Sequence, residues 1–84
     1  MNIYVGNLSY KTSENDLSQL FGTYGEVTSA KIVMDKMTNR SKGFGFVEMS
    51  NDEHAKTAIE EINGKDVGGR NLKVNESIPK DSNR

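Results

Sequence analysis

Apolar and polar residues alternate along several short stretches of the chain, whereas in two longer stretches apolar residues recur every three or four positions. Alternation with a period of two predicts a β-strand, because successive side chains then point to opposite faces of a sheet. The longer spacing predicts an amphipathic helix. The expected strands are residues 2–6, 27–34, 42–49 and 70–76. One helix is expected after the first strand and one after the third.

The two expected helices begin at residues whose side chains cap a helix N-terminus. Ser13 followed by Asp16 resembles a capping box, with Asp in place of the usual Glu or Gln, and Asn51 is a natural N-cap for the second helix. The apolar stripes of the helices are Leu17, Leu20 and Phe21 in the first and Ala55, Ala58, Ile59 and Ile62 in the second. Because each helix has one stripe, both must cover the same face of the sheet.

The resulting order, β-α-β-β-α-β, is the ferredoxin-like split arrangement, an α+β fold with a four-stranded antiparallel sheet. With both helices on one face, the other face of the sheet is left open to solvent. Residues 1–77 are expected to form this single domain. Residues 65–69 are a glycine-containing turn with room for a short hairpin, and residues 78–84 are expected to form a polar, frayed tail.

The strand expected at residues 42–49 places unlike side chains on its two faces. One face carries Phe44, Phe46 and Glu48, and the other carries Gly45, Val47 and Met49. The side with Val47 and Met49 suits a core, so both phenylalanines are left on the open face, where antiparallel sheets usually carry polar groups. Flat rings beside a cation such as Lys42 can stack on nucleobases while the ammonium meets phosphate. This pattern favours nucleic-acid binding.

The same alternation assigns faces to the other strands. Tyr4 reaches the open face if the first strand lies beside the central one. The other residues expected on or near the open face are Lys31, Val33, Arg40, Lys73 and Asn75. Those expected on the core side are Ala30, Ile32, Met34, Leu72 and Val74. Tyr10, in the loop after the first strand, is expected to pack its ring over the start of the first helix.

Two segments resemble the sequence motifs of the RNA-recognition motif (RRM) family. Residues 42–49 match the octamer K/R-G-F/Y-G/A-F-V-x-F/Y except at Met49, where an aromatic residue is usual. Residues 3–8, Ile-Tyr-Val-Gly-Asn-Leu, resemble the family's hexamer motif. The resemblance covers residues 1–77. Over this length the chain is similar to short single-domain bacterial RNA-binding proteins and to the RRM of plant glycine-rich RNA-binding proteins.

The resemblance implies a role for each matched residue. Tyr4 and Phe46 would stack on two successive bases, Phe44 would insert against the sugars between them, and Lys42 would meet a phosphate. Lys31, Val33, Arg40, Lys73 and Asn75 are expected as flanking contacts from geometry alone. Met49 faces the core, so its departure from the motif is expected to change packing rather than recognition.

Charge is distributed unevenly although the formal net charge is only −1. Lys31, Lys36, Arg40 and Lys42 lie close together in the sequence, with Asp35 as the one acid among them, whereas the acidic residues concentrate in the two helical stretches. We therefore expect a weakly basic open face backed by acidic helices. Nucleic-acid binding should then depend on base stacking more than on phosphate contacts.

Composition argues against several other classes of protein. The chain has no cysteine and a single histidine, His54, so neither a metal site nor a catalytic triad in its common forms is expected, and no cofactor. The βαββαβ plan also occurs in acylphosphatases, but their phosphate-cradling arginine after the first strand is missing from residues 6–10. No apolar run approaches the roughly 18 residues needed to span a membrane, and residues 1–6 do not resemble a signal peptide.

The leading hypothesis is therefore a non-enzymatic, cytoplasmic, monomeric module that binds single-stranded RNA, with single-stranded DNA as a second ligand. The alternative from another class is an RRM-fold protein–protein interaction domain that uses its aromatic residues or acidic helices on a partner. Such domains often lose the exposed aromatic residues. Retention of Tyr4, Phe44 and Phe46 favours RNA.

Overall fold

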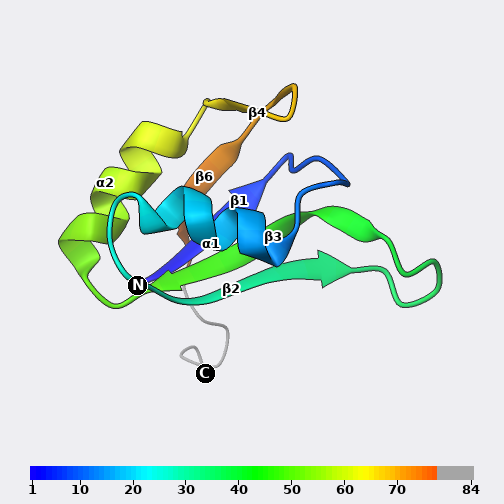
Figure 1. Ribbon diagram of the computed structural model, residues 1–84, viewed down its shortest axis with the longest axis horizontal. Helices are drawn as coiled ribbons and strands as arrows, with labels where there is room; N and C mark the ends of the chain where they lie inside the picture. The colour runs from blue at the N-terminus through cyan, green and yellow to red at the C-terminus, as the bar shows by residue number, and fades with distance from the viewer. Residues whose placement is uncertain (78–84) are drawn as a thin grey trace.

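Four strands form one antiparallel sheet in the order β2-β3-β1-β6, and two short strands form a separate hairpin (Figure 1). The structure is a computed structural model that describes residues 1–77. The elements are β1 (Asn2–Gly6), α1 (Glu14–Gly22), β2 (Val27–Met34), β3 (Ser41–Met49), α2 (Asp52–Ile62), β4 (Asp66–Val67), β5 (Arg70–Asn71) and β6 (Lys73–Ser77). The predicted α+β fold class is confirmed. The expected tail at residues 78–84 lies outside the described residues.

The core lies between the two helices and the sheet face that they cover. Its fully buried members include Ile3 and Val5 from β1, Val47 and Met49 from β3, and Phe21 from α1. The other buried apolar residues are Leu8, Leu17, Ile32, Ala55, Ala58, Ile62, Leu72 and Val74. Burying one side chain of the size of Leu or Phe contributes about 1.5–3 kcal/mol relative to leaving it exposed. This one face therefore holds the apolar burial that stabilises the domain.

Both helices begin at the caps that the sequence predicts. The Ser13 hydroxyl accepts a hydrogen bond from the Asp16 N–H at 3.1 Å, and the Asp16 carboxylate accepts one from the Ser13 N–H at 3.0 Å. The Asn51 side-chain oxygen accepts from the His54 N–H at 3.0 Å. Backbone N–H groups that have no partner within a helix are thereby satisfied at both N-termini.

Each helix also reaches one edge strand of the sheet through a side-chain oxygen. Glu14, the first residue of α1, accepts a hydrogen bond from the Ile32 N–H of β2 at 3.1 Å. Asn63, the C-cap of α2, accepts one from the Val74 N–H of β6 at 3.0 Å. Edge strands expose unpaired backbone groups that can pair with other chains. These two contacts cover part of both edges and fix the helices against the sheet.

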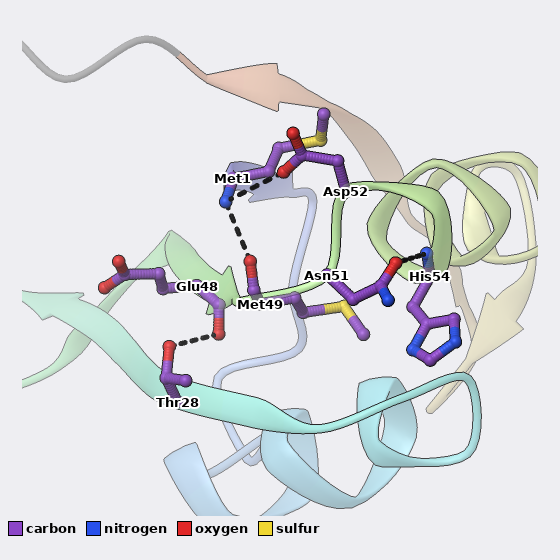
Figure 2. A network of polar contacts seen from close by, with 7 residues as sticks. All are labelled: Met1, Thr28, Glu48, Met49, Asn51, Asp52 and His54. Atoms are coloured by element: carbon purple, nitrogen blue, oxygen red, sulfur yellow. Dashed lines mark hydrogen bonds and ion pairs between the residues drawn. The ribbon is translucent and has the colours of Figure 1, made fainter.

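The end of β3 is tied to the start of α2 by a group of polar contacts (Figure 2). The amino group of Met1 donates to the Met49 carbonyl at 2.7 Å and lies 3.6 Å from the Asp52 carboxylate. On the other side of β3, the Thr28 hydroxyl donates to the Glu48 carbonyl at 3.0 Å, where the β2–β3 register shifts. These contacts hold the end of β3 between its two neighbouring segments.

Two details of the strands differ from the sequence-based expectation. Met34 was expected in the core but is 49% exposed, because β2 and β3 extend beyond the helices as a long arm (Figure 1). Arg70 was expected in the last strand, but residues 70–71 pair with residues 66–67 as the β4–β5 hairpin, and β6 begins at Lys73. Among the described residues, no helix is long and apolar enough to cross a bilayer.

Candidate nucleic-acid interface

Three aromatic rings meet on the open face of the sheet, over its two central strands. Tyr4 of β1 pairs across the ladder with Phe46 of β3, and Phe44 lies two residues before Phe46 on the same side. The ring centroids are 5.9 Å apart for Tyr4 and Phe46, 6.0 Å for Tyr4 and Phe44, and 6.2 Å for Phe44 and Phe46. We call these three residues the ring surface. They share one face, as the alternation predicts.

The rings pack against each other without being covered. Phe46 is 39% exposed, and Tyr4 and Phe44 are half-buried. The Phe44 and Phe46 ring planes are perpendicular, and Tyr4 is tilted by 34° from Phe44. Edge-to-face pairs at these separations contribute about 0.5–1.5 kcal/mol beyond area burial. The mutual contacts therefore hold the rings in place, while apolar surface remains available to a flat ligand.

Gly6 leaves room for the Tyr4 ring on the open face. A Cβ atom at Gly6 would lie 2.5 Å from the Tyr4 hydroxyl oxygen and 2.9 Å from two carbons of the ring. The ring therefore lies along β1, over a residue that has no side chain. Gly6 therefore provides clearance for the aromatic side chain of Tyr4.

Gly45 leaves room for the neighbouring strand. A Cβ at Gly45 would collide with the backbone of Lys31 and Ile32 in β2. The glycine therefore permits the close approach of two adjacent strands. Because Lys31 pairs with Phe46 in that ladder, this approach also places the backbone of the exposed residue Lys31 beside the ring surface.

Polar residues surround the ring surface on both sides. Lys31 lies opposite Phe46 on β2, Asn75 lies opposite Tyr4 on β6, and Lys73 lies opposite Gly6. All three are exposed. Val33 is half-buried and falls within the register shift between Ile32 and Met34. Alternation alone therefore does not show which face of the sheet its side chain lies on.

Opposite charges lie at the two ends of β3. At one end Glu48 pairs with Asn2 of β1 and Ser29 of β2, which form a polar border that sequence reasoning did not identify. At the other end Lys42 and Arg40 are both exposed. Phosphate groups are therefore favoured near the Lys42 end and disfavoured near Glu48.

Lys42 and Arg40 lie at a hollow together with Phe44 and residues from two loops. The hollow is lined by Tyr10, Asp35, Thr38, Arg40, Lys42 and Phe44. Tyr10 is 73% exposed, so its ring does not pack closely over the start of α1 as expected, although it borders a second hollow there with Ser13 and Glu14. Leu8 is the residue of this loop that is buried instead, and its N–H donates to the Gly43 carbonyl at 2.8 Å.

The guanidinium of Arg70, close to the last strand, is used for contacts within the domain. Arg70 donates from Nε and Nη2 to the Asn7 side-chain oxygen at 3.2 and 2.9 Å. Asn7 in turn donates to the Asn71 carbonyl at 2.7 Å. These bonds fasten the β4–β5 hairpin to the end of β1. Within residues 1–77, no three His, Cys, Asp or Glu side chains are placed to hold a metal ion.

Comparison with known proteins gives consistent matches. The family model described as the RNA recognition motif matches residues 3–73. The putative RNA-binding protein RbpD of Nostoc sp. is 45% identical over 84 residues, which cover 100% of this chain and 89% of RbpD. The chloroplastic RNA-binding protein CP33 of Arabidopsis thaliana is 51% identical over 73 residues, 87% of this chain but only 22% of CP33.

Solved structures of similar sequence have the same fold. The crystal structure of the RNA-binding protein PG1 is 50% identical, with a TM-score of 0.92, and the match covers 95% of this chain and 96% of PG1. The structure of the Rna15 RRM with bound RNA (GU) is 33% identical, with a TM-score of 0.81, over 90% of this chain and 81% of that one.

Proposed function

The chain belongs to the RNA recognition motif family, and we propose that it binds single-stranded RNA on the ring surface of its sheet. The observation that carries this proposal is the contact of Tyr4, Phe44 and Phe46 on a face that no helix covers. Base–aromatic stacking contributes about 1–3 kcal/mol per base. Three partly exposed rings at separations near 6 Å are suited to successive bases of one strand.

The proposed roles follow the positions of the side chains. Tyr4 and Phe46 stack on two successive bases, Phe44 contacts the sugars between them, and Lys42 meets a phosphate. Support comes from the exposure of Phe46 and Lys42 and from the placement of Tyr4 directly opposite Phe46. The proposed flanking contacts are Lys31, Val33, Arg40, Lys73 and Asn75.

Single strands fit this surface better than duplexes, because bases in a duplex are stacked on each other and unavailable to the rings. Single-stranded DNA offers the same base faces, so we propose it as a second ligand. All three rings come from one chain, which supports action as a monomer, and the cysteine-free sequence is compatible with the cytoplasm. We propose binding without catalysis, because the one histidine, His54, lies on α2, which packs on the covered face.

Titration with short RNA and DNA oligomers at two salt concentrations tests this function. Only two or three bases have rings to stack on, so we expect a Kd for short RNA of about 1 µM, equivalent to a binding free energy of roughly −8 kcal/mol. Nanomolar affinity for a four-nucleotide oligomer would contradict this estimate. If no oligomer binds at protein concentrations well above 10 µM, the protein–protein interaction alternative would replace RNA binding.

A further inference from the structure

The polar border at the Glu48 end of β3 crosses the whole four-stranded sheet. Glu48 pairs with Ser29 of β2 and with Asn2 of β1, and Asn2 pairs in turn with Ser77 of β6. On β1, β2 and β3 the neighbouring residues in sequence belong to the core or pack against it. Alternation therefore places the border on the open face, on the same side of the sheet as the ring surface.

The border is the row of side chains next to the rings. Glu48 follows Phe46 by two residues on the same face of one strand, which corresponds to about 7 Å along the strand. In the β1–β3 ladder, the pair of Asn2 with Glu48 likewise lies two residues beyond the pair of Tyr4 with Phe46. An extended Glu48 side chain can therefore reach the edge of a base that lies over Phe46.

The Glu48 carboxylate takes no part in the contacts that hold its own strand. The Thr28 hydroxyl donates to the Glu48 backbone carbonyl, and the side chain extends away from Met1 and Met49 (Figure 2). The residue is exposed, and within residues 1–77 its carboxylate has no hydrogen bond or ion pair. An exposed glutamate is common on protein surfaces. On a face that binds a polyanion, however, a carboxylate is unfavourable unless hydrogen-bond donors meet it.

The chemistry of a carboxylate distinguishes among the RNA bases. An ionised carboxylate only accepts hydrogen bonds, and its two oxygens can accept side by side. Guanine has two adjacent donors, N1–H and N2–H, on its Watson–Crick edge, an edge that proteins contact in single strands. On the same edge adenine, cytosine and uracil have an acceptor next to a donor, and that acceptor would face a carboxylate oxygen. Guanine is therefore the base that suits this position.

We propose that Glu48 recognises guanine: the base that stacks on Phe46 is preferentially guanine, and its N1–H and N2–H donate to the Glu48 carboxylate. The proposal rests on the proposed RNA-binding function and adds a base preference at one position. It gives the carboxylate on the open face an attractive role toward RNA, whereas its charge alone would only repel phosphate.

The test compares RNA oligomers that differ at one base. A single guanosine is moved through each position of a short uridine oligomer to find where it raises affinity, and inosine then replaces it there. Inosine lacks the N2 amino group but keeps N1–H and the purine ring, so the comparison isolates one hydrogen bond. For the wild type this replacement should weaken binding about tenfold, near the low end for a hydrogen bond to a charged group, because the site is exposed.

Glu48→Gln and Glu48→Ala are the test variants, and Glu76→Gln is the matched control. Glu76 is exposed on β6 and pairs with the buried residue Ile3, so it lies on the helix side of the sheet. All three variants lose one negative charge, which changes phosphate attraction for guanosine and inosine oligomers alike. The ratio of the two affinities cancels this change. The ratio should fall below about twofold in both Glu48 variants and stay near tenfold in Glu76→Gln.

Each other outcome contradicts the proposal in a distinct way. If the wild type binds RNA but does not distinguish guanosine from inosine at any position, Glu48 does not recognise guanine. If both Glu48 variants keep the full ratio while urea unfolding shows that they are folded, another residue contacts the amino group. If Glu76→Gln loses the ratio as well, the preference does not come from the polar border. Absence of binding by the wild type to every oligomer would instead refute the proposed function.

Discussion

Both faces of the sheet carry apolar side chains, but helices cover only one of the faces. On the face beneath the helices, Ile3, Val5 and Val47 are at most 1% exposed, whereas on the open face Phe46 is 39% exposed. Phe46 and Val47 are neighbours in β3, so a single step along the chain separates buried from accessible apolar surface. The difference shows that apolar composition alone does not identify a core. Whether an apolar side chain is buried or remains accessible depends on whether helices cover its face of the sheet.

The covered face stabilises the domain, and the open face is available for binding. Apolar surface in contact with water contributes little to folding, so the rings on the open face stabilise the domain mainly through their contacts with each other. Removing a core side chain should therefore change the free energy of unfolding, whereas removing a ring should chiefly change affinity for RNA. The following predictions test this separation.

The largest expected effect comes from the core. Phe21→Ala removes the largest fully buried side chain and should lower the free energy of unfolding by about 3–5 kcal/mol, from lost transfer free energy and the cavity left behind. Phe46→Ala is the matched control, the same chemical change on the open face, with a smaller expected loss of about 1–2 kcal/mol from its contacts with the other two rings. Urea unfolding of both variants measures the two values. Equal losses would mean that the two faces contribute alike to stability.

A smaller effect is expected from salt, because the open face carries only a few cations. With two to four phosphates neutralised by Lys42 and some of Lys31, Arg40 and Lys73, the slope of log K against log salt should be roughly −1.5 to −3. A fourfold rise in salt would then weaken binding about 8- to 60-fold. A slope near zero would remove phosphate contact from the mechanism, and one beyond about −5 would indicate a larger basic surface.

Single charge changes sharpen the same comparison between faces. Lys42→Gln should make the slope less negative by about 0.7, the contribution of one phosphate contact to a single strand. Lys56→Gln removes the same charge from α2, on the covered side, and should leave the slope unchanged. Salt titrations of both variants with one RNA oligomer give the comparison. Equal changes would mean that RNA reaches the helices as well as the sheet.

The smallest of these effects concerns the helix layer. Ser13→Ala removes the side chain that accepts the Asp16 N–H at the start of α1 and should lower the free energy of unfolding by about 1 kcal/mol. Affinity for RNA should not change, because α1 does not contact the open face. Ser13→Thr, which keeps a capping hydroxyl, should restore most of the stability. A loss of affinity in a stably folded Ser13→Ala variant would show that the layers are coupled.

Much of the covered face could be predicted because periodicity encodes burial directly. Leu17 and Phe21 in α1 and Val47 and Met49 in β3 are buried as their spacing predicts. The facing of Tyr4, Phe44 and Phe46 followed from the same alternation. Both caps, Ser13 and Asn51, were recognisable because the capping residue and the residue that it bonds are close in sequence.

The features that were missed depend on contacts between distant segments. Alternation predicts which face of the sheet a side chain lies on only while the strands pair regularly. In β2 and β3 the pairing is irregular: Ile32 pairs with Gly45 and Met34 pairs with Ser41, so two residues of β2 lie opposite four residues of β3. Met34 accordingly lies beyond the covered region. Tyr10 and Leu8 lie in a loop without periodicity, so nothing local distinguishes the buried residue from the exposed one. The hollow lined by Tyr10 and Arg40 could not be predicted for the same reason, since its two loops are brought together only by the fold.

The most direct test of the separation between the faces is the pair Phe46→Ala and Val47→Ala, each measured by urea unfolding and by titration with one RNA oligomer. Phe46→Ala should weaken RNA binding by about 1–3 kcal/mol in a folded domain. Val47→Ala should lower the free energy of unfolding by about 1–3 kcal/mol, through lost burial and a cavity, with little direct effect on RNA. If Phe46→Ala unfolds the domain while Val47→Ala abolishes binding in a folded one, the assignment of the two faces is inverted and the ring surface is not the site.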